Sequence, residues 1–269
     1  MGGVVHKLIH GYALEEMDKL IAQGVKVDAI ITDPPFEITA CKWDKIIPFD
    51  LMWERLKKLI KPRGAIVLCG AEPFSSALRM SNIEQYKYDW IWEKTQATGH
   101  LNANKRPLVC HENIVVFYGT QCFYTPQKTH GHSPMNTGVR KSSHENNCYG
   151  KINTCDMPFG GNTDRYPRSI IKFKSDKQVE YLHPTQKPLA LMEYLIRTYT
   201  NEGEIVLDFT MGVGTTGLAC KNTNRDFIGI EKVKEYFVLA QERIEKGYVS
   251  EKIEEPTIDV WDIVFNGGK

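Results

Sequence analysis

A glycine-rich turn late in the chain places the strongest constraint on its fold. The apolar residues 205–207 predict a buried parallel strand, which ends in the acid Asp208. Gly212 and Gly214 then mark a turn, and the residues that follow predict a helix. Such a strand, turn and helix N-terminus bring the backbone close to a ligand and point N–H groups at it. The turn is therefore predicted to form one wall of a binding site.

A second acid indicates what this wall binds. Residues 227–230 predict the next strand, and Glu231 ends it. An acid at the end of the second strand of a Rossmann unit accepts hydrogen bonds from vicinal ribose hydroxyls. Glycine spacing by itself is a weak signal, but strand, helix and terminal acid supply its context. We therefore predict a nucleoside site at the glycine turn and Glu231.

The position of this unit predicts the order of the strands. A doubly wound sheet normally begins with its glycine unit, whereas here little chain follows Glu231. The other strands must come from upstream, so we expect an α/β Rossmann-like fold with a mixed, mainly parallel sheet and circularly permuted motifs. Apolar patterns predict strands over 5–9, 27–32, 65–69, 89–93 and 114–118, and helices over 13–22, 49–61, 75–81, 189–199 and 235–246.

The tetrapeptide Asp33-Pro34-Pro35-Phe36 follows directly on one of these strands. Two consecutive prolines fix φ and remove two donors, so the loop is stiff and nearby carbonyls are free to accept hydrogen bonds. Ligands of open α/β sheets bind beyond the carboxyl ends of strands, where Asp33 is expected. A carboxylate, a free carbonyl and the ring of Phe36 suit a planar group with an exocyclic amine, a nucleobase taken out of its stack. The alternative is a rigid loop with an N-capping Asp33.

Two polar segments carry candidates for contact with nucleic acid. The first, residues 94–112, is basic and includes Lys105 and Arg106; it predicts either a substrate-facing loop or a solvated connection. The second, residues 119–182, loses hydrophobic periodicity and carries nine Lys and Arg against five Asp and Glu, a formal charge of +4. Its aromatic and basic residues alternate, which suits the bases and phosphates of nucleic acid. The alternative for this second segment is disorder.

Cysteine and histidine usage favours neither a disulfide framework nor a metal site. The chain has seven scattered cysteines, an odd number, which indicates reduced thiols and a cytoplasmic protein. No Cys-x₂-Cys pair occurs, and the spacing of His130 and His132 is not that of a structural zinc site, so no metal is expected. No apolar run approaches a membrane span, and no signal-peptide pattern occurs at the N-terminus. The net charge of only +1 means that any nucleic-acid surface must be local.

The motifs and their order resemble the beta group of DNA amino-methyltransferases. The tetrapeptide 33–36 comes first, His183-Pro184-Thr185-Gln186-Lys187-Pro188 follows, and the segment 208–217 with Glu231 comes last. The resemblance implies S-adenosylmethionine as the methyl donor and site-specific methylation of double-stranded DNA, as in restriction–modification. It also implies that a flipped adenine is held by its N6 amine, with direct in-line transfer of the methyl group.

The resemblance assigns roles to individual residues. The implied catalytic residues are Asp33, Pro34, Pro35 and Phe36. The implied cofactor-binding residues are Asp33, Thr185, Lys187, Asp208, Thr210, Gly212, Gly214, Thr215 and Glu231, with the turn at Thr185 and Lys187 near the methionine end. The chain departs from the family at two places: Asp208-Phe209-Thr210 stands where members often read Asp-Pro-Phe, and Gly11-Tyr12 where an acid often follows the early glycine.

The resemblance also divides the chain. We expect a catalytic half over 1–118, a target-recognition region over 119–182, a cofactor-binding half over 183–249 and a tail over 250–269. DNA is expected at basic residues of the two polar segments, which are Lys105, Arg106, Arg140, Lys141, Arg165 and Arg168. No membrane partner is expected, and a homodimer is left open.

Three other functions are compatible with parts of the sequence. An N4-cytosine methyltransferase uses the same geometry, but that branch more often begins its tetrapeptide with Ser, so Asp33 favours adenine. An NAD-dependent oxidoreductase would use the glycine unit and leave residues 33–36 unexplained. A non-catalytic DNA-binding module with this fold would not need the intact tetrapeptide.

Overall fold

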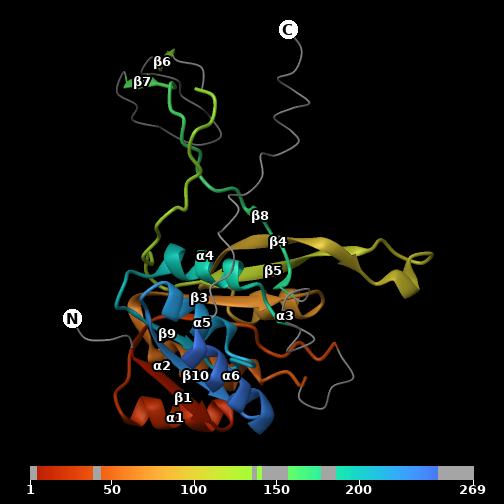
Figure 1. The fold of residues 1–269 in the computed structure, drawn as a ribbon, viewed down its shortest axis with the longest axis vertical. Coiled ribbons are helices and arrows are strands. Elements are labelled where there is room, and N and C mark those ends of the chain that lie inside the picture. The colour runs from red at the N-terminus through yellow and green to blue at the C-terminus, as the bar shows by residue number, and fades with distance from the viewer. Residues whose placement is uncertain (1–4, 39–43, 135–137, 141–156, 177–185, 248–269) are drawn as a thin grey trace. The chain divides into compact units, whose positions relative to one another are not determined.

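The computed structural model describes residues 5–38, 44–134, 138–140, 157–176 and 186–247 (Figure 1). Residues 126–167 form a compact unit of their own, and the rest of the described chain forms the other unit. The larger unit contains all the strands of the main sheet and every described helix. None of the described helices has the length and apolarity that crossing a membrane would require.

The main sheet has eight strands among the described residues, and its order confirms the permuted Rossmann-like fold. From edge to edge the strands are β1 (His6–His10), β10 (Asp226–Glu231), β9 (Ile205–Asp208), β2 (Val27–Thr32), β3 (Ile60–Gly70), β5 (Val109–Phe117), β4 (Tyr86–Thr98) and β8 (Ile170–Phe173). The first five run parallel to one another, β5 is antiparallel to β3 and β4, and β8 is parallel to β4. The late strand β9 thus pairs with the early strand β2, as the motif order predicts.

Helices cover both faces of the sheet because the central strands are apolar on both sides. The helices are α1 (Ala13–Ala22), α2 (Phe49–Leu59), α3 (Phe74–Ser81), α4 (Leu189–Tyr199), α5 (Thr215–Asn222) and α6 (Lys234–Lys246). Alternate residues of β2 separate into two buried clusters: Ile31 packs in the cluster of α4, α5 and α6, while Ile30 packs in that of α1, α2 and α3. This two-sided burial explains the continuous apolar runs that predicted these strands.

The predicted boundary between the helix over 49–61 and the strand over 65–69 was wrong. The helix predicted over 49–61 ends at Leu59, and Pro62 and Gly64 lie inside β3. Ile60 is already extended, because it pairs with Val27 of β2. A Cβ at Gly64 would lie 2.6 Å from the backbone oxygen of Asp28, so this register requires glycine.

The segment 94–112 is not a loop throughout. β4 runs to Thr98 and β5 begins at Val109, with a 3₁₀ turn at His100–Asn102 between them. Figure 1 shows this hairpin projecting from the sheet. Strand pairing therefore continues into a polar sequence, where an apolar alternation could not indicate it.

The smaller unit has structure of its own within the segment predicted to recognise the target. β6 (Gly138–Arg140) pairs antiparallel with β7 (Met157–Phe159), and the backbones of Thr129 and Arg165 exchange hydrogen bonds. His130 Nδ1 lies 2.8 Å from Asp164 Oδ1. The chain returns to the main sheet at β8, so the compact unit, 126–167, is shorter than the predicted region 119–182.

Candidate active site

The two motifs that are far apart in sequence meet at one cavity of about 1350 Å³. Parallel strands place their carboxyl ends at the same edge of a sheet, so the residues after β2, β9 and β10 converge there. Phe36 and Gly212 both line this cavity. Further predicted site residues in its lining are Asp33, Pro34, Pro35, Lys187, Asp208, Thr210, Thr215 and Glu231.

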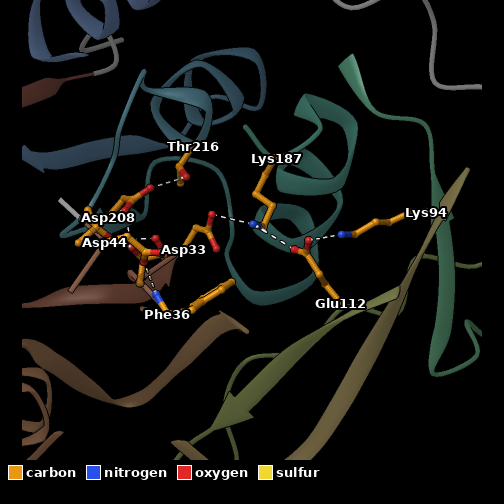
Figure 2. Close-up of polar contacts among 10 residues, drawn as sticks. Asp33, Phe36, Asp44, Lys94, Glu112, Lys187, Asp208 and Thr216 are labelled. Atoms are coloured by element: carbon orange, nitrogen blue, oxygen red, sulfur yellow. Dashed lines mark hydrogen bonds and ion pairs between the residues drawn. The ribbon is translucent and has the colours of Figure 1, made fainter. Parts of the chain in front are cut away.

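Asp33, at the end of β2, has one engaged and one unengaged oxygen. Its Oδ2 accepts a hydrogen bond from Lys187 Nζ at 2.6 Å (Figure 2). Its Oδ1 is buried and has no hydrogen-bond partner among the described residues. Burial raises the pKa of Asp33 to about 6, against the lowering effect of Lys187. Asp33 lines the cavity, so this wall carries one carboxylate acceptor that no described group engages.

Lys187 is shared between two carboxylates. Its Nζ lies 3.1 Å from Glu112 Oε2 as well as 2.6 Å from Asp33, and the side chain is only 7% exposed. Glu112, on β5, is also ion-paired with Lys94 of β4. Burial alone would raise the pKa of Glu112, but Lys187 and Lys94 together lower it below its usual value. Burial likewise opposes charge on Lys187, yet Asp33 and Glu112 raise its pKa.

The loop that carries Phe36 is held by a buried carboxylate, Asp44. The backbone N–H groups of Phe36 and Glu37 donate to its Oδ1 at 2.9 Å, and that of Ile38 donates to Oδ2 at 3.1 Å. The Phe36 ring packs on Phe74 with centroids 4.9 Å apart. These contacts fix the ring at the cavity wall.

Asp208 joins the two walls through threonines. Its Oδ1 accepts from Thr32 Oγ1 of β2 at 2.5 Å, and its Oδ2 accepts from Thr216 Oγ1 of α5 at 2.6 Å (Figure 2). Burial raises the pKa of Asp208 to about 6, and these hydrogen bonds oppose the rise. Thr210 Oγ1 donates to the backbone oxygen of Asp33 at 3.2 Å. Thr210, at which the chain departs from the family pattern, thus connects the loop after β9 to the loop after β2.

Glu231 anchors the glycine turn from the end of β10. Its Oε2 accepts from the Gly212 N–H at 3.0 Å and its Oε1 from the Val233 N–H at 2.7 Å. Burial raises its pKa above the usual value. Gly212 adopts φ +53°, a left-handed conformation that favours glycine. Gly214 is not in the cavity lining; a Cβ there would lie 2.9 Å from that of Ala240, so this glycine serves the packing of α6.

The remaining predicted residues are dispersed. Thr185 and Lys141 lie outside the described residues, as does the side chain of Arg140 in β6. Lys105 and Arg106 are exposed on the β4–β5 hairpin, and Arg106 also lines the cavity. Arg165 belongs to the compact unit 126–167, where its guanidinium donates to the backbone oxygen of Asn162 at 2.8 Å. Arg168 lies just beyond that unit.

Three residues that the geometry makes prominent escaped the sequence interpretation: Lys94, Glu112 and Asp44. Asp44 is set apart by no pattern in the sequence. Glu112 had one signal, because it is the only acid in the basic segment 94–112. The resemblance implies that Lys187 contacts the cofactor. Lys187 lines the cavity with its ammonium between two carboxylates, and the cofactor contact stays a prediction.

Comparison with known proteins decides the family. A model of the DNA methylase family matches residues 27–242, which is most of the chain and includes both walls of the cavity. The chain belongs to this DNA methylase family. The resemblance inferred from the motifs is thereby confirmed.

Individual relatives of this DNA methylase match along most of its length. The type II methyltransferase M.HpaI of Haemophilus parainfluenzae is 29% identical over 270 residues, covering 90% of this chain and 75% of the relative. The DNA adenine methyltransferase YhdJ of Escherichia coli K12 is 27% identical, covering 91% and 84%. Among solved structures, the chain is similar to the crystal structure of the M1.HpyAVI–SAM complex, with 31% sequence identity and a TM-score of 0.63. The match covers 89% of this chain and 99% of the M1.HpyAVI chain.

Proposed function

We propose that this DNA methylase transfers a methyl group from S-adenosylmethionine to the exocyclic N6 amine of an adenine flipped out of double-stranded DNA. The observation that carries the proposal is the unengaged Oδ1 of Asp33, a residue that lines the same cavity as Glu231 and Gly212. Asp33, the proposed acceptor for an amine, and Glu231, the proposed acceptor for a ribose, thus line the same cavity.

The cavity has room for both ligands. Sites for a single drug-sized ligand span roughly 300–1,000 Å³, and this cavity measures about 1350 Å³. A cofactor on the glycine wall and a flipped base on the wall of Phe36 account for the larger volume.

The glycine wall has donors and acceptors that fit the cofactor. The Glu231 carboxylate accepts backbone N–H groups on both oxygens, and its roughly four lone-pair directions leave capacity for a ribose hydroxyl. Among the described residues, none beyond its chain neighbours comes within 4 Å of the place where a Cβ of Gly212 would stand, so the turn leaves room for a ligand. When bound, S-adenosylmethionine supplies an electrophilic methyl group on its sulfonium.

The other wall orients the amine. Asp33 Oδ1 accepts a hydrogen bond from the N6 amine, which favours a pyramidal nitrogen and aims its lone pair across the cavity. Phe36 stacks on the base, with its own ring held by Phe74. The amine loses a proton on methylation, and Asp33, with a pKa of about 6, is suited to accept it. No nucleophilic side chain is needed for a direct transfer.

Adenine is favoured over cytosine by the Asp that begins the tetrapeptide and by similarity to the DNA adenine methyltransferase YhdJ. Duplex DNA incubated with the protein and S-adenosylmethionine, then digested to nucleosides for mass spectrometry, is expected to contain N6-methyladenine. N4-methylcytosine would overturn the choice of base, and the absence of both would overturn the proposed activity.

Replacing Phe36 by Ala is expected to weaken the complex with flipped-base DNA by about 1–3 kcal/mol, the usual contribution of one stacked base. Fluorescence of duplex DNA with 2-aminopurine at the target position reports the flipped state, and titration gives the affinity. Phe36→Tyr keeps the ring and should retain wild-type affinity. Unchanged affinity and turnover in Phe36→Ala would remove Phe36 from the base site.

Lys105 and Arg106 are proposed to contact DNA phosphates, because they are exposed on a hairpin whose base lines the cavity. Each phosphate contact contributes about 0.9 to the slope of log K against log salt. The double variant Lys105→Ala/Arg106→Ala is therefore expected to lower that slope by about 2. A matched control is Lys57→Ala/Lys58→Ala on the exposed side of α2, which is expected to leave the slope unchanged. Equal slopes for the two double variants would contradict the assignment.

A further inference from the structure

Four charged side chains from separate elements alternate in sign beside the cavity. In order they are Lys94 on β4, Glu112 on β5, Lys187 before α4 and Asp33 after β2 (Figure 2). Three ion pairs join the four, and the two inner members are largely buried, with 15% and 7% of the Glu112 and Lys187 side chains exposed. The four formal charges cancel, so the group as a whole is neutral.

We propose that Glu112, supported by Lys94, is a positioning residue for methyl transfer. It holds Lys187 on Oδ2 of Asp33 and thereby leaves Oδ1 of Asp33 free to accept the amine of the target base. The inference rests on the proposed function for the identity of that amine, and on the ion-pair geometry for the arrangement itself.

The physical reason lies in the sharing of one ammonium by two carboxylates. A buried charge is costly unless it is paired, so Lys187 must be neutralised within the protein. With Glu112 present, Asp33 supplies only part of that neutralisation and engages one oxygen. Without the charge of Glu112, Lys187 would draw more strongly on Asp33, which would then be a weaker acceptor for the base. Without Lys187, the two carboxylates would face each other without a shared counterion.

These two losses act on Asp33 in opposite directions. The groups that act on it electrostatically include Lys187, Glu112 and Lys94, together with Cys69 of β3 and Asp208 of β9. Burial and the charge of Glu112 raise the pKa of Asp33. The charges of Lys187 and Lys94 lower it. Glu112→Gln is therefore expected to lower the pKa of Asp33, and Lys187→Met to raise it. Opposite shifts would show that both charges act on Asp33, and the effect on kcat then judges the positioning role.

The test measures Asp33 directly in the full-length protein without cofactor. The ¹³Cγ resonances of labelled aspartates are followed against pH, and Asp33→Asn identifies the signal. We expect a pKa below the wild-type value in Glu112→Gln and above it in Lys187→Met. Glu93→Gln is the matched control, because Glu93 lies next to Lys94 on β4, pairs with Lys172 at 2.9 Å and does not line the cavity. Its Asp33 titration should match wild type.

Turnover supplies the second readout. The carboxylate form of Asp33 is the active one, so kcat should fall below its pKa, and this acid limb should move to lower pH in Glu112→Gln. At neutral pH, misplacement of the acceptor is expected to reduce kcat roughly tenfold to a hundredfold, with a smaller change in KM for DNA. An unmoved Asp33 pKa in Glu112→Gln, or shifts of the same sign in both variants, would overturn the inference. Glu112→Gln decides alone if Lys187→Met does not fold.

Failure of the proposed function would be recognised separately. If the wild-type protein does not methylate DNA, the proposed activity is wrong, whereas the titration of Asp33 still judges the ion-pair arrangement. If the wild type methylates and Glu112→Gln behaves as Glu93→Gln does, only the positioning role is wrong.

Discussion

Replacing Asp33 by Ala is expected to lower kcat for DNA methylation by at least roughly 10²–10³-fold, the cost of removing one preorganised polar group at a reacting centre. The variant removes Oδ1, the unengaged acceptor that is proposed to bind the amine. The lone pair of the amine is then delocalised into the ring and no longer aimed. Incorporation of labelled methyl from S-adenosylmethionine into duplex DNA measures the effect.

Controls separate this loss from a loss of binding or of folding. Affinity for duplex DNA should change little, because phosphate contacts contribute most of it. Asp33→Asn keeps the shape and one carbonyl oxygen but not the charge, so its kcat should lie between those of Asp33→Ala and wild type. Turnover close to wild type in Asp33→Ala would refute the assignment of Asp33 as the group that orients the base.

Replacing Glu231 by Ala is expected to weaken binding of S-adenosylmethionine by roughly 10²-fold or more, since hydrogen bonds to a charged group contribute about 1.5–3 kcal/mol each. The loss has two sources: the acceptors for the ribose hydroxyls, and the anchor of the Gly212 N–H that shapes the turn. Calorimetric titration with S-adenosylmethionine measures the affinity. In steady-state assays KM for S-adenosylmethionine should rise far more than kcat falls.

Glu235→Ala is the matched control for this second effect. Glu235 is exposed in the first turn of α6, only four residues away, and does not line the cavity. It should bind S-adenosylmethionine as wild type does, and both variants should keep the wild-type circular dichroism spectrum. Equal affinity in Glu231→Ala and Glu235→Ala would show that the ribose lies elsewhere.

Family membership also removes one rival function from another class. The match over residues 27–242 assigns the glycine unit to a DNA methylase rather than to an NAD-dependent oxidoreductase. A DNA-binding module without catalysis would have no use for Asp33. Burying Asp33 and Lys187 as a pair costs the desolvation of both charges, which such a module would have no reason to retain. Loss of methyl transfer in Asp33→Ala is thus also the evidence that separates an enzyme from a DNA-binding module.

Local sequence patterns predicted an element correctly where the residues of that element alone determine its structure. The strand at Val27–Thr32 and the strand at Asp226–Glu231 were predictable because both faces of the sheet bury them. The extended β4–β5 hairpin was not, because its pairing joins polar residues such as Glu93 and His111. Backbone hydrogen bonds between β4 and β5 stabilise that hairpin. The side chains of a short stretch of sequence do not indicate such bonds.

The amino-acid sequence by itself determined the family, the permuted order of the sheet and the two motifs that face each other across the cavity. Each of these follows from contiguous residues: an apolar run, a stiff proline pair, a glycine turn or an acid at a strand end. Only the tertiary structure decided which charges meet. Lys187 pairs with Asp33, which lies 154 positions away in the sequence. Ion pairs depend on distance in space, and the packing of β2, β5 and α4 sets that distance.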